Sequence, residues 1–163
     1  MGGVATGRLT PFVENWIVPA ERLAKRFPTL YDVLGGWTEK YRWYANWVYQ
    51  CWFYDMDFVP FDVWQVDRQM AAQRSVSTSA CHAYDSLFAT DLTNFLDCVQ
   101  ARTLVLSGIQ DGTVPVDQAH LLAERIKGAQ LVLYDQCGHF PMFEKVDDYL
   151  ATLNIFFAQK GNA

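Results

Sequence analysis

The chain has 163 residues, 51% of them hydrophobic and 19% charged, which suits one domain with a packed core and excludes wholesale disorder. The net charge is -5 and no block of Lys or Arg occurs, so neither nucleic acid nor an anionic membrane is expected as the main partner. No apolar run approaches the roughly 20 residues that span a bilayer, and no signal peptide is visible. The four cysteines are far apart and predict reduced, buried thiols in a cytoplasmic protein: Cys51, Cys81, Cys98 and Cys137.

The first hundred residues are rich in aromatic side chains and predict helices without a convincing strand. Residues 1–19 read as irregular, and a short helix is expected over residues 20–27. A turn at Gly35-Gly36 precedes a long helix predicted over residues 39–57. Apolar side chains cover most of the circumference of that helix, which indicates either burial or a ligand cavity on one side.

The segment that follows Pro60 is predicted to begin another helix. Asp62, with Gln65 three residues later, resembles a capping box at a helix start. Residues 75–79 read as a polar loop, and residues 80–98 predict one or two helices with a break near Asp91.

The last third of the chain shows a different pattern. Residues 103–107 form a short apolar run that predicts a strand buried on both faces, and residues 130–134 predict a second strand. A helix lies between them and ends before Gly128. The closing helix has an apolar face, and its members are Val146, Tyr149, Leu150, Leu153 and Phe157. This order predicts a right-handed parallel strand–helix unit and an α/β fold.

Each predicted strand is followed by a loop with one titratable residue, Asp111 after the first and His139 after the second. Loops at the carboxyl ends of parallel strands converge on one crevice, so the two side chains can meet although 139 − 111 = 28 residues separate them. An acid beside a histidine holds the imidazole in the tautomer that a general base needs. Asp111 alone fits equally well as a turn residue before Gly112.

These segments resemble the C-terminal part of the α/β-hydrolase superfamily. The resemblance covers about residues 90–160 and rests on Thr103-Leu-Val-Leu-Ser-Gly108, Asp111 and Val114-Pro115, followed by Gly138-His-Phe-Pro141 and Glu144. It implies a partial α/β-hydrolase fold with a helical cap or lid region over residues 1–90 and two parallel strand–helix units over residues 91–163. It also implies that Asp111 is the triad acid and His139 the base.

The chain departs from the family pattern in one large respect. Members carry a nucleophile elbow, G-x-S-x-G, and follow the order nucleophile, acid, histidine. No serine here has glycines two positions away on both sides. The family order also requires a neighbouring strand and oxyanion donors that this sequence does not supply. We therefore expect a complementary N-terminal hydrolase half, a homo-oligomer such as a domain-swapped dimer, or a fragment.

Several other residues have both a functional and a purely structural interpretation. In a cap, Trp43, Tyr44, Trp47 and Trp52 would line an apolar substrate pocket, although packing explains them equally well. We interpret His82 and His120 as surface or structural residues, and Cys137 as a small buried residue rather than a nucleophile. No cofactor is expected, and no ligand spacing predicts a metal site.

Two functions of different classes follow. In the first, the chain supplies acid and base for hydrolysis of an ester or a similar bond in a small apolar substrate, with the nucleophile on another half. The isolated chain is then expected to be inactive. An Asp nucleophile in that half would suit epoxide or haloalkane hydrolysis instead. In the second, the chain is a non-catalytic binding or assembly module that keeps the hydrolase loops.

Overall fold

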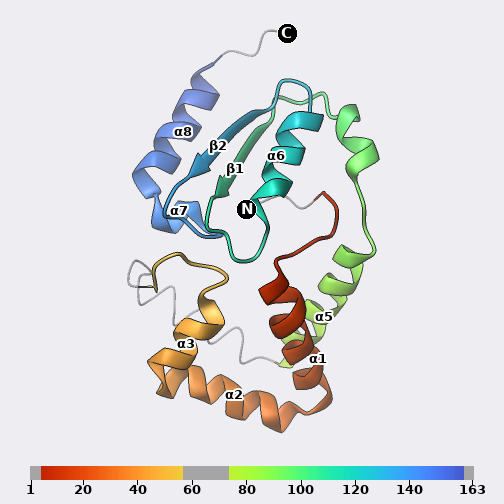
Figure 1. Cartoon of the computed structure of the whole chain (residues 1–163), viewed down its shortest axis with the longest axis vertical. Coiled ribbons are helices and arrows are strands. Elements are labelled where there is room, and N and C mark those ends of the chain that lie inside the picture. Colours follow the sequence, from red (N-terminus) through yellow and green to blue (C-terminus); the bar gives the residue numbers. More distant parts are fainter. Residues whose placement is uncertain (1–4, 57–73, 160–163) are drawn as a thin grey trace.

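The computed structural model describes residues 5–56 and 74–159 (Figure 1). Two parallel strands form its sheet, β1 (Leu104–Gly108) and β2 (Gln130–Tyr134). The helices are the π-helix η1 (Val13–Ile17), α1 (Val18–Arg26), α2 (Pro28–Lys40), α3 (Arg42–Tyr49), α5 (Arg74–Phe88), the 3-10 helix η3 (Thr93–Cys98), α6 (Val116–Arg125), α7 (Pro141–Glu144) and α8 (Val146–Ala158).

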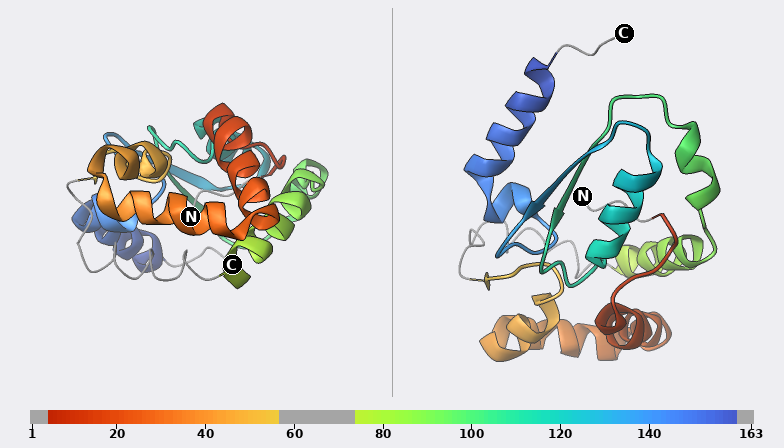
Figure 2. Two further views of the ribbon diagram at one scale, coloured as in Figure 1. Left: turned by 90° about the horizontal axis from the view of Figure 1, so that it is seen from below. Right: turned by 45° about the horizontal axis from the view of Figure 1, so that its top comes forward.

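The sheet and its helices confirm the predicted parallel unit. Leu104 pairs with Gln130, and the register continues to Gly108 opposite Tyr134. Helix α6 connects the strands, and α8 lies on the other side of the sheet, where the Tyr134 hydroxyl donates to Thr152 at 3.0 Å (Figure 2). Both arrowheads point toward the helices α1 to α3, so the loops that follow the strands face the helical part of the chain (Figure 1).

The prediction of one long helix over residues 39–57 is wrong, because α2 ends at Lys40 and α3 runs from Arg42 to Tyr49. Helix α2 begins at Pro28, which suits the first turn of a helix, and runs through the predicted turn at Gly35-Gly36. Two glycines cost a helix only about 1 kcal/mol each, and tertiary contacts outweigh that cost. The break falls instead at Tyr41, whose backbone is extended (φ -123°, ψ 106°). There the rings of Trp37 and Tyr41 pack 6.2 Å apart.

Two predicted irregular segments are also helical. Residues 13–17 form η1, which continues directly into α1, and the predicted polar loop at residues 75–79 lies inside α5. Ser and Thr disfavour a helix by less than about 0.7 kcal/mol each, and α5 packs along α1 with an ion pair of 2.7 Å between Arg22 and Asp85. The predicted break near Asp91 is confirmed. The capping box at Asp62 lies outside the described residues.

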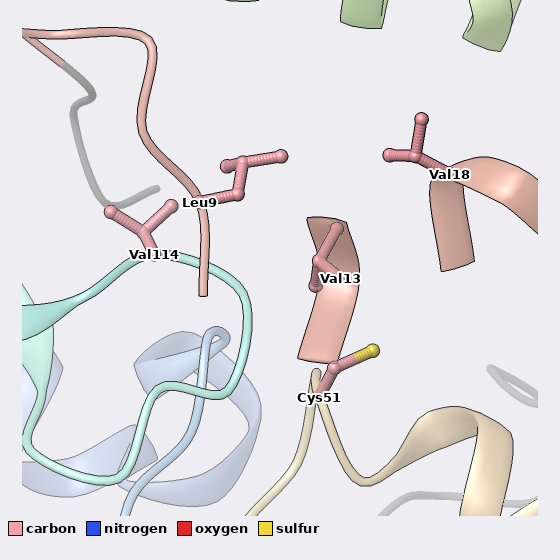
Figure 3. Close-up of a cluster of buried hydrophobic side chains, with 5 residues drawn as sticks. All are labelled: Leu9, Val13, Val18, Cys51 and Val114. Carbon is pink, nitrogen blue, oxygen red and sulfur yellow. The ribbon is translucent and has the colours of Figure 1, made fainter. Parts of the chain in front are cut away.

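A hydrophobic cluster joins the helical half to the strand-end loops (Figure 3). Its five buried members come from three separate parts of the chain, and they are Leu9, Val13, Val18, Cys51 and Val114. Cys51 follows α3, whereas Val114 lies in the loop after β1. Packing between them therefore fixes the position of the helices relative to the carboxyl end of the sheet.

The N-terminal segment is held by a buried glutamine of α6. Gln118 is 2% exposed, and its Oε1 atom accepts bonds from the backbone amides of Ala5 and Thr6, both at 3.2 Å, and from the Thr6 hydroxyl at 3.0 Å. Ala5 also packs with Leu96 and Ile126 in a second buried cluster. One polar side chain thus anchors a segment that is more than 110 residues away along the chain.

Helix α8 contributes no buried residue, and one face of it is both apolar and exposed. Val146 is 46% exposed, Leu150 51% and Phe157 74%. Tyr149 and Leu153, which the sequence placed on the same face, are half-buried. Among the described residues, no helix is long and apolar enough to cross a membrane.

Candidate active site

Asp111 sits in the turn that follows β1. Its backbone amide donates to the carbonyl of Gly108 at 3.4 Å, and its Oδ1 atom accepts from the amides of Thr113 and Val114 at 2.8 and 3.0 Å. The side chain is 1% exposed. Two backbone donors fix the orientation of the carboxylate in this buried position.

His139 sits in the loop that follows β2, and Gln110 ties that loop to the first one. The Gln110 side-chain oxygen accepts from the amide of Cys137 at 3.1 Å, and its backbone amide donates to the Cys137 carbonyl at 3.1 Å. Gln136 turns the chain with a left-handed φ of 51°. The two strand ends are therefore linked by reciprocal hydrogen bonds, which hold their loops side by side.

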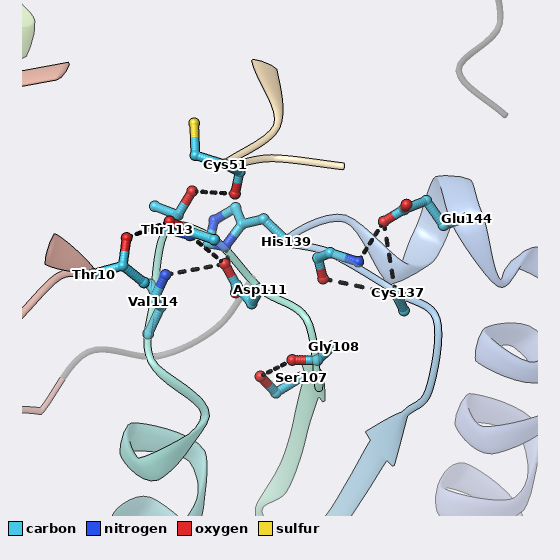
Figure 4. A network of polar contacts seen from close by, with 12 residues as sticks. Thr10, Cys51, Ser107, Gly108, Asp111, Thr113, Val114, Cys137, His139 and Glu144 are labelled. Atoms are coloured by element: carbon cyan, nitrogen blue, oxygen red, sulfur yellow. Dashed lines mark hydrogen bonds and ion pairs between the residues drawn. The ribbon is translucent and has the colours of Figure 1, made fainter. Parts of the chain in front are cut away.

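The Nδ1 atom of His139 lies 2.8 Å from the Oδ2 atom of Asp111 (Figure 4). This contact confirms the proximity predicted from the strand order. A carboxylate accepts only, so Nδ1 carries the proton and Nε2 is the ring nitrogen that can accept one. The His139 side chain is 14% exposed, which leaves the ring with limited access to solvent.

A segment from the helical half, residues 51–55, packs against both loops. The amide of His139 donates to the Trp52 carbonyl at 2.7 Å, and the Thr113 hydroxyl donates to the Cys51 carbonyl at 2.8 Å. Glycine is required at both contacts. A Cβ atom on Gly112 would lie 2.7 Å from the Cα of Cys51, and one on Gly138 would lie 2.6 Å from the Trp52 oxygen.

The four predicted substrate-lining aromatics occupy two different settings. Trp43, Tyr44 and Trp47 lie on α3, and the first of them is 67% exposed. In the described part of the chain their ring contacts are to one another and to four other aromatics, namely Phe12, Trp16, Trp37 and Tyr41. Trp52 is half-buried in the segment bonded to His139. Their role as pocket residues stays a prediction.

The remaining candidates lie where structural residues would. Cys137 is fully buried, and burial together with the nearby Glu144 carboxylate raises the pKa of its thiol to about 12, so it stays protonated. His82 and His120 are on the surface. All four cysteines are free, but Cys98 is exposed, contrary to the expected burial. Over residues 5–56 and 74–159, no three His, Cys, Asp or Glu side chains are grouped to bind a metal ion.

Three polar residues that support the site were not singled out from the sequence: Gln110, Thr113 and Gln118. Each acts on backbone groups far away along the chain, and such contacts leave no periodicity or motif to detect. The aromatic pattern pointed instead to α3, which shows how a binding interpretation and a packing interpretation share one sequence signal.

Comparison with known proteins gives matches that cover only part of the chain. No family model matches the chain. A 2-hydroxy-6-oxo-6-phenylhexa-2,4-dienoate hydrolase of Comamonas testosteroni is 36% identical over 63 residues, which are 39% of this chain and 22% of that protein. A proline iminopeptidase of Saccharolobus solfataricus is 35% identical over 69 residues, which are 42% of this chain and 22% of that protein.

Solved structures show the same fold. An α/β-hydrolase from a deep-sea metagenome library of the Medee basin aligns with a TM-score of 0.58 at 20% identity, over 90% of this chain and 63% of its own. A 2-hydroxy-6-oxo-6-phenylhexa-2,4-dienoate hydrolase from Rhodococcus sp. strain RHA1 aligns with a TM-score of 0.58 at 24% identity, over 74% and 44%. This chain is related to the α/β-hydrolase superfamily. The part of the α/β-hydrolase fold that it carries is helix-rich with a small parallel sheet, and the matched regions span less than two thirds of these relatives.

Proposed function

We propose that this chain supplies the acid and the general base of an α/β-hydrolase active site, with Asp111 as the acid and His139 as the base. One observation carries the proposal, the 2.8 Å contact between Asp111 Oδ2 and His139 Nδ1. The two oxygens of Asp111 have different partners. Oδ1 accepts from the amides of Thr113 and Val114 and so fills the turn role. The catalytic role is supported by Oδ2, which belongs to a buried carboxylate and contacts the His139 imidazole, whose Nε2 is left for proton transfer.

The proposed reaction is hydrolysis of an ester or a similar bond in a small apolar substrate. A serine hydroxyl from an N-terminal hydrolase half would attack the carbonyl carbon while Nε2 of His139 takes its proton. Asp111 stabilises the imidazolium that forms. The same proton then passes to the leaving oxygen, and His139 takes a proton from water as that water hydrolyses the acyl intermediate. With an Asp nucleophile, His139 would activate the water only.

The proposed partner of the sheet is a nucleophile-bearing hydrolase half. A two-stranded parallel sheet is marginal by itself, because parallel sheets are stable when both faces are covered and their edges are paired. The apolar face of α8, formed by Val146, Leu150 and Phe157, is exposed and would be covered in such an assembly. We assign residues 1–90 to its cap and residues 91–163 to its C-terminal core.

A fusion protein tests this function. An N-terminal α/β-hydrolase segment that carries a G-x-S-x-G nucleophile elbow is joined to this chain, and hydrolysis of aryl esters is followed. We expect turnover from the fusion, none above background from the isolated chain, and none from a fusion whose nucleophile is replaced by Ala. A folded, monomeric fusion that hydrolyses no faster than its Ala variant would contradict the proposal.

The binding-module alternative predicts a different outcome. A stable homodimer of the isolated chain that forms no productive assembly with the hydrolase segment would favour it. The exposed face of α8 is then expected to lie in the dimer interface, and Leu150→Asp would dissociate the dimer as measured by sedimentation.

A further inference from the structure

The carboxylate of Glu144 binds two backbone segments at once. Its Oε1 atom accepts from the amide of Tyr54 at 2.6 Å and from that of Asp55 at 3.2 Å. Its Oε2 atom accepts from the amide of Gly138 at 2.7 Å and lies 3.8 Å from the Cys137 sulfur (Figure 4). Each oxygen therefore serves one segment, and the two segments are more than 80 residues apart along the chain.

The hydrogen bonds of Glu144 lie next to the one that the His139 backbone makes with Trp52. Gly138 immediately precedes His139, whose amide is bonded to the Trp52 carbonyl. Tyr54 and Asp55 follow Trp52 two and three residues later. Phe53 and Phe140 directly follow Trp52 and His139, and their rings lie 5.3 Å apart, which adds an apolar contact between the same two segments. Glu144 thus joins residue 138, which precedes the histidine, to residues 54–55, which follow the histidine's partner Trp52.

We propose that Glu144 is a positioning residue that holds His139 in register with Asp111 by joining the histidine loop to residues 54–55 of the helical half. The inference rests on the proposed function of His139 and adds a second residue that acts through it. A carboxylate suits this place because both of its oxygens accept, and the amides of Tyr54, Asp55 and Gly138 each offer an N–H. Hydrogen bonds to a charged acceptor are also stronger than those to a neutral one.

The chemistry of substitution makes the proposal testable. Glu144→Gln keeps the shape, but its amide has one accepting oxygen and one donating nitrogen, so it can serve only one of the two segments. Glu144→Ala serves neither. A residue that merely fills space would be replaced by Gln without effect. Glu124 on α6 is exposed, and Glu124→Gln is the matched control.

Amide hydrogen exchange measured by NMR on the intact chain is the experiment. In E144A, exchange at Gly138, Tyr54 and Asp55 should speed up by at least about tenfold. In E144Q it should do so at one of the two segments. The amides of Ile109 and Gln130, which bond to Tyr134 and Thr103 at the two ends of the strand pairing, should not change, because Glu144 bonds to neither of them. The Nδ1 proton signal of His139 should broaden in both variants and stay sharp in E124Q.

Two results would overturn the inference. Full protection of all three amides in E144Q would show that only shape matters, and equal acceleration at Ile109 and Gln130 would show a general loss of stability. The proposed function fails separately. If His139→Gln leaves the fusion fully active, then His139 is not the base, whatever the exchange rates are. If H139Q abolishes turnover while E144Q leaves the Nδ1 signal unchanged, then only the role of Glu144 is wrong.

Discussion

The backbone amide of His139 donates to the carbonyl of Trp52 at 2.7 Å, so the histidine loop is bonded directly to the helical half of the chain. The Asp111 loop meets the same segment through the Thr113 hydroxyl and the Cys51 carbonyl. Both loops are therefore shaped by residues 51–55 as well as by the strands that carry them. The geometry of the acid–histidine pair depends on contacts between both parts of the chain.

Gly138→Ala should destabilise the fold and displace the histidine loop. The added methyl group would lie 2.6 Å from the Trp52 oxygen and 2.9 Å from the Phe53 Cα, and this backbone cannot move without breaking the bond to His139. We expect the free energy of unfolding, measured with urea, to fall by about 1–3 kcal/mol. Gly36→Ala is the control, because a Cβ added there would meet no atom within 4 Å beyond the neighbouring backbone of α2, and it should raise stability by roughly 0.5–1 kcal/mol. Equal effects of the two substitutions would contradict the packing described.

Gln118→Ala should release the N-terminal segment. Its side-chain oxygen is the acceptor for the amides of Ala5 and Thr6 and for the Thr6 hydroxyl, and its loss leaves these donors unsatisfied. The expected cost is about 1–3 kcal/mol in the free energy of unfolding. Gln100→Ala, at an exposed position, should change stability by less than about 0.5 kcal/mol. Unchanged urea midpoints in both variants would show that the segment is not anchored through Gln118.

Stability should fall as pH rises above about 9. Burial raises the pKa of the Cys51 and Cys137 thiols from 9.0 to about 12. Between these values the unfolded chain has released protons that the folded chain still binds, so the free energy of unfolding decreases with pH. Urea titrations at pH 8, 9, 10 and 11 measure this slope.

Substitution of the thiols separates their effect from general alkaline unfolding. The double variant Cys51→Ala, Cys137→Ala should show a shallower slope than the unaltered chain, whereas Cys98→Ala, at an exposed thiol, should show the same slope. A slope that the double variant leaves unchanged would mean that these thiols are not held protonated by the fold.

The strand–helix part of the fold could be predicted from sequence because its signals are local. Short apolar runs at residues 103–107 and 130–134 define the strands, and the carboxyl-end rule brings Asp111 and His139 together. The helical part was harder to predict from the sequence, because aromatic residues occur equally well in helices, in loops and on the walls of a cavity. Helix α2 ends at Lys40, where Trp37 makes ring contacts with Tyr41 and with Tyr44 of α3, and no periodicity in the sequence reveals such contacts.

The supporting bonds could not be predicted for a related reason. Glu144 lies in a recognisable motif, but its acceptors for Tyr54 and Gly138 link segments whose proximity depends on the whole fold. Gln118 belongs to an ordinary amphipathic helix, and its burial follows from the path of residues 5–6 over α6. Side chains that bind distant backbone groups carry no signature in the residues around them.

A double-mutant cycle on the fusion protein tests the central claim most directly. The values of kcat/KM for aryl-ester hydrolysis are measured for Asp111→Asn, His139→Gln and the double variant, with Asp117→Asn and His120→Gln on the exposed side of α6 as matched controls. If Asp111 and His139 act as one acid–base unit, each single change should lower kcat/KM by about 10³- to 10⁴-fold. The kcat/KM of the double variant should then equal that of the less active single variant. Losses that multiply in the double variant, or an Asp111→Asn fusion that works as well as the two controls, would contradict it.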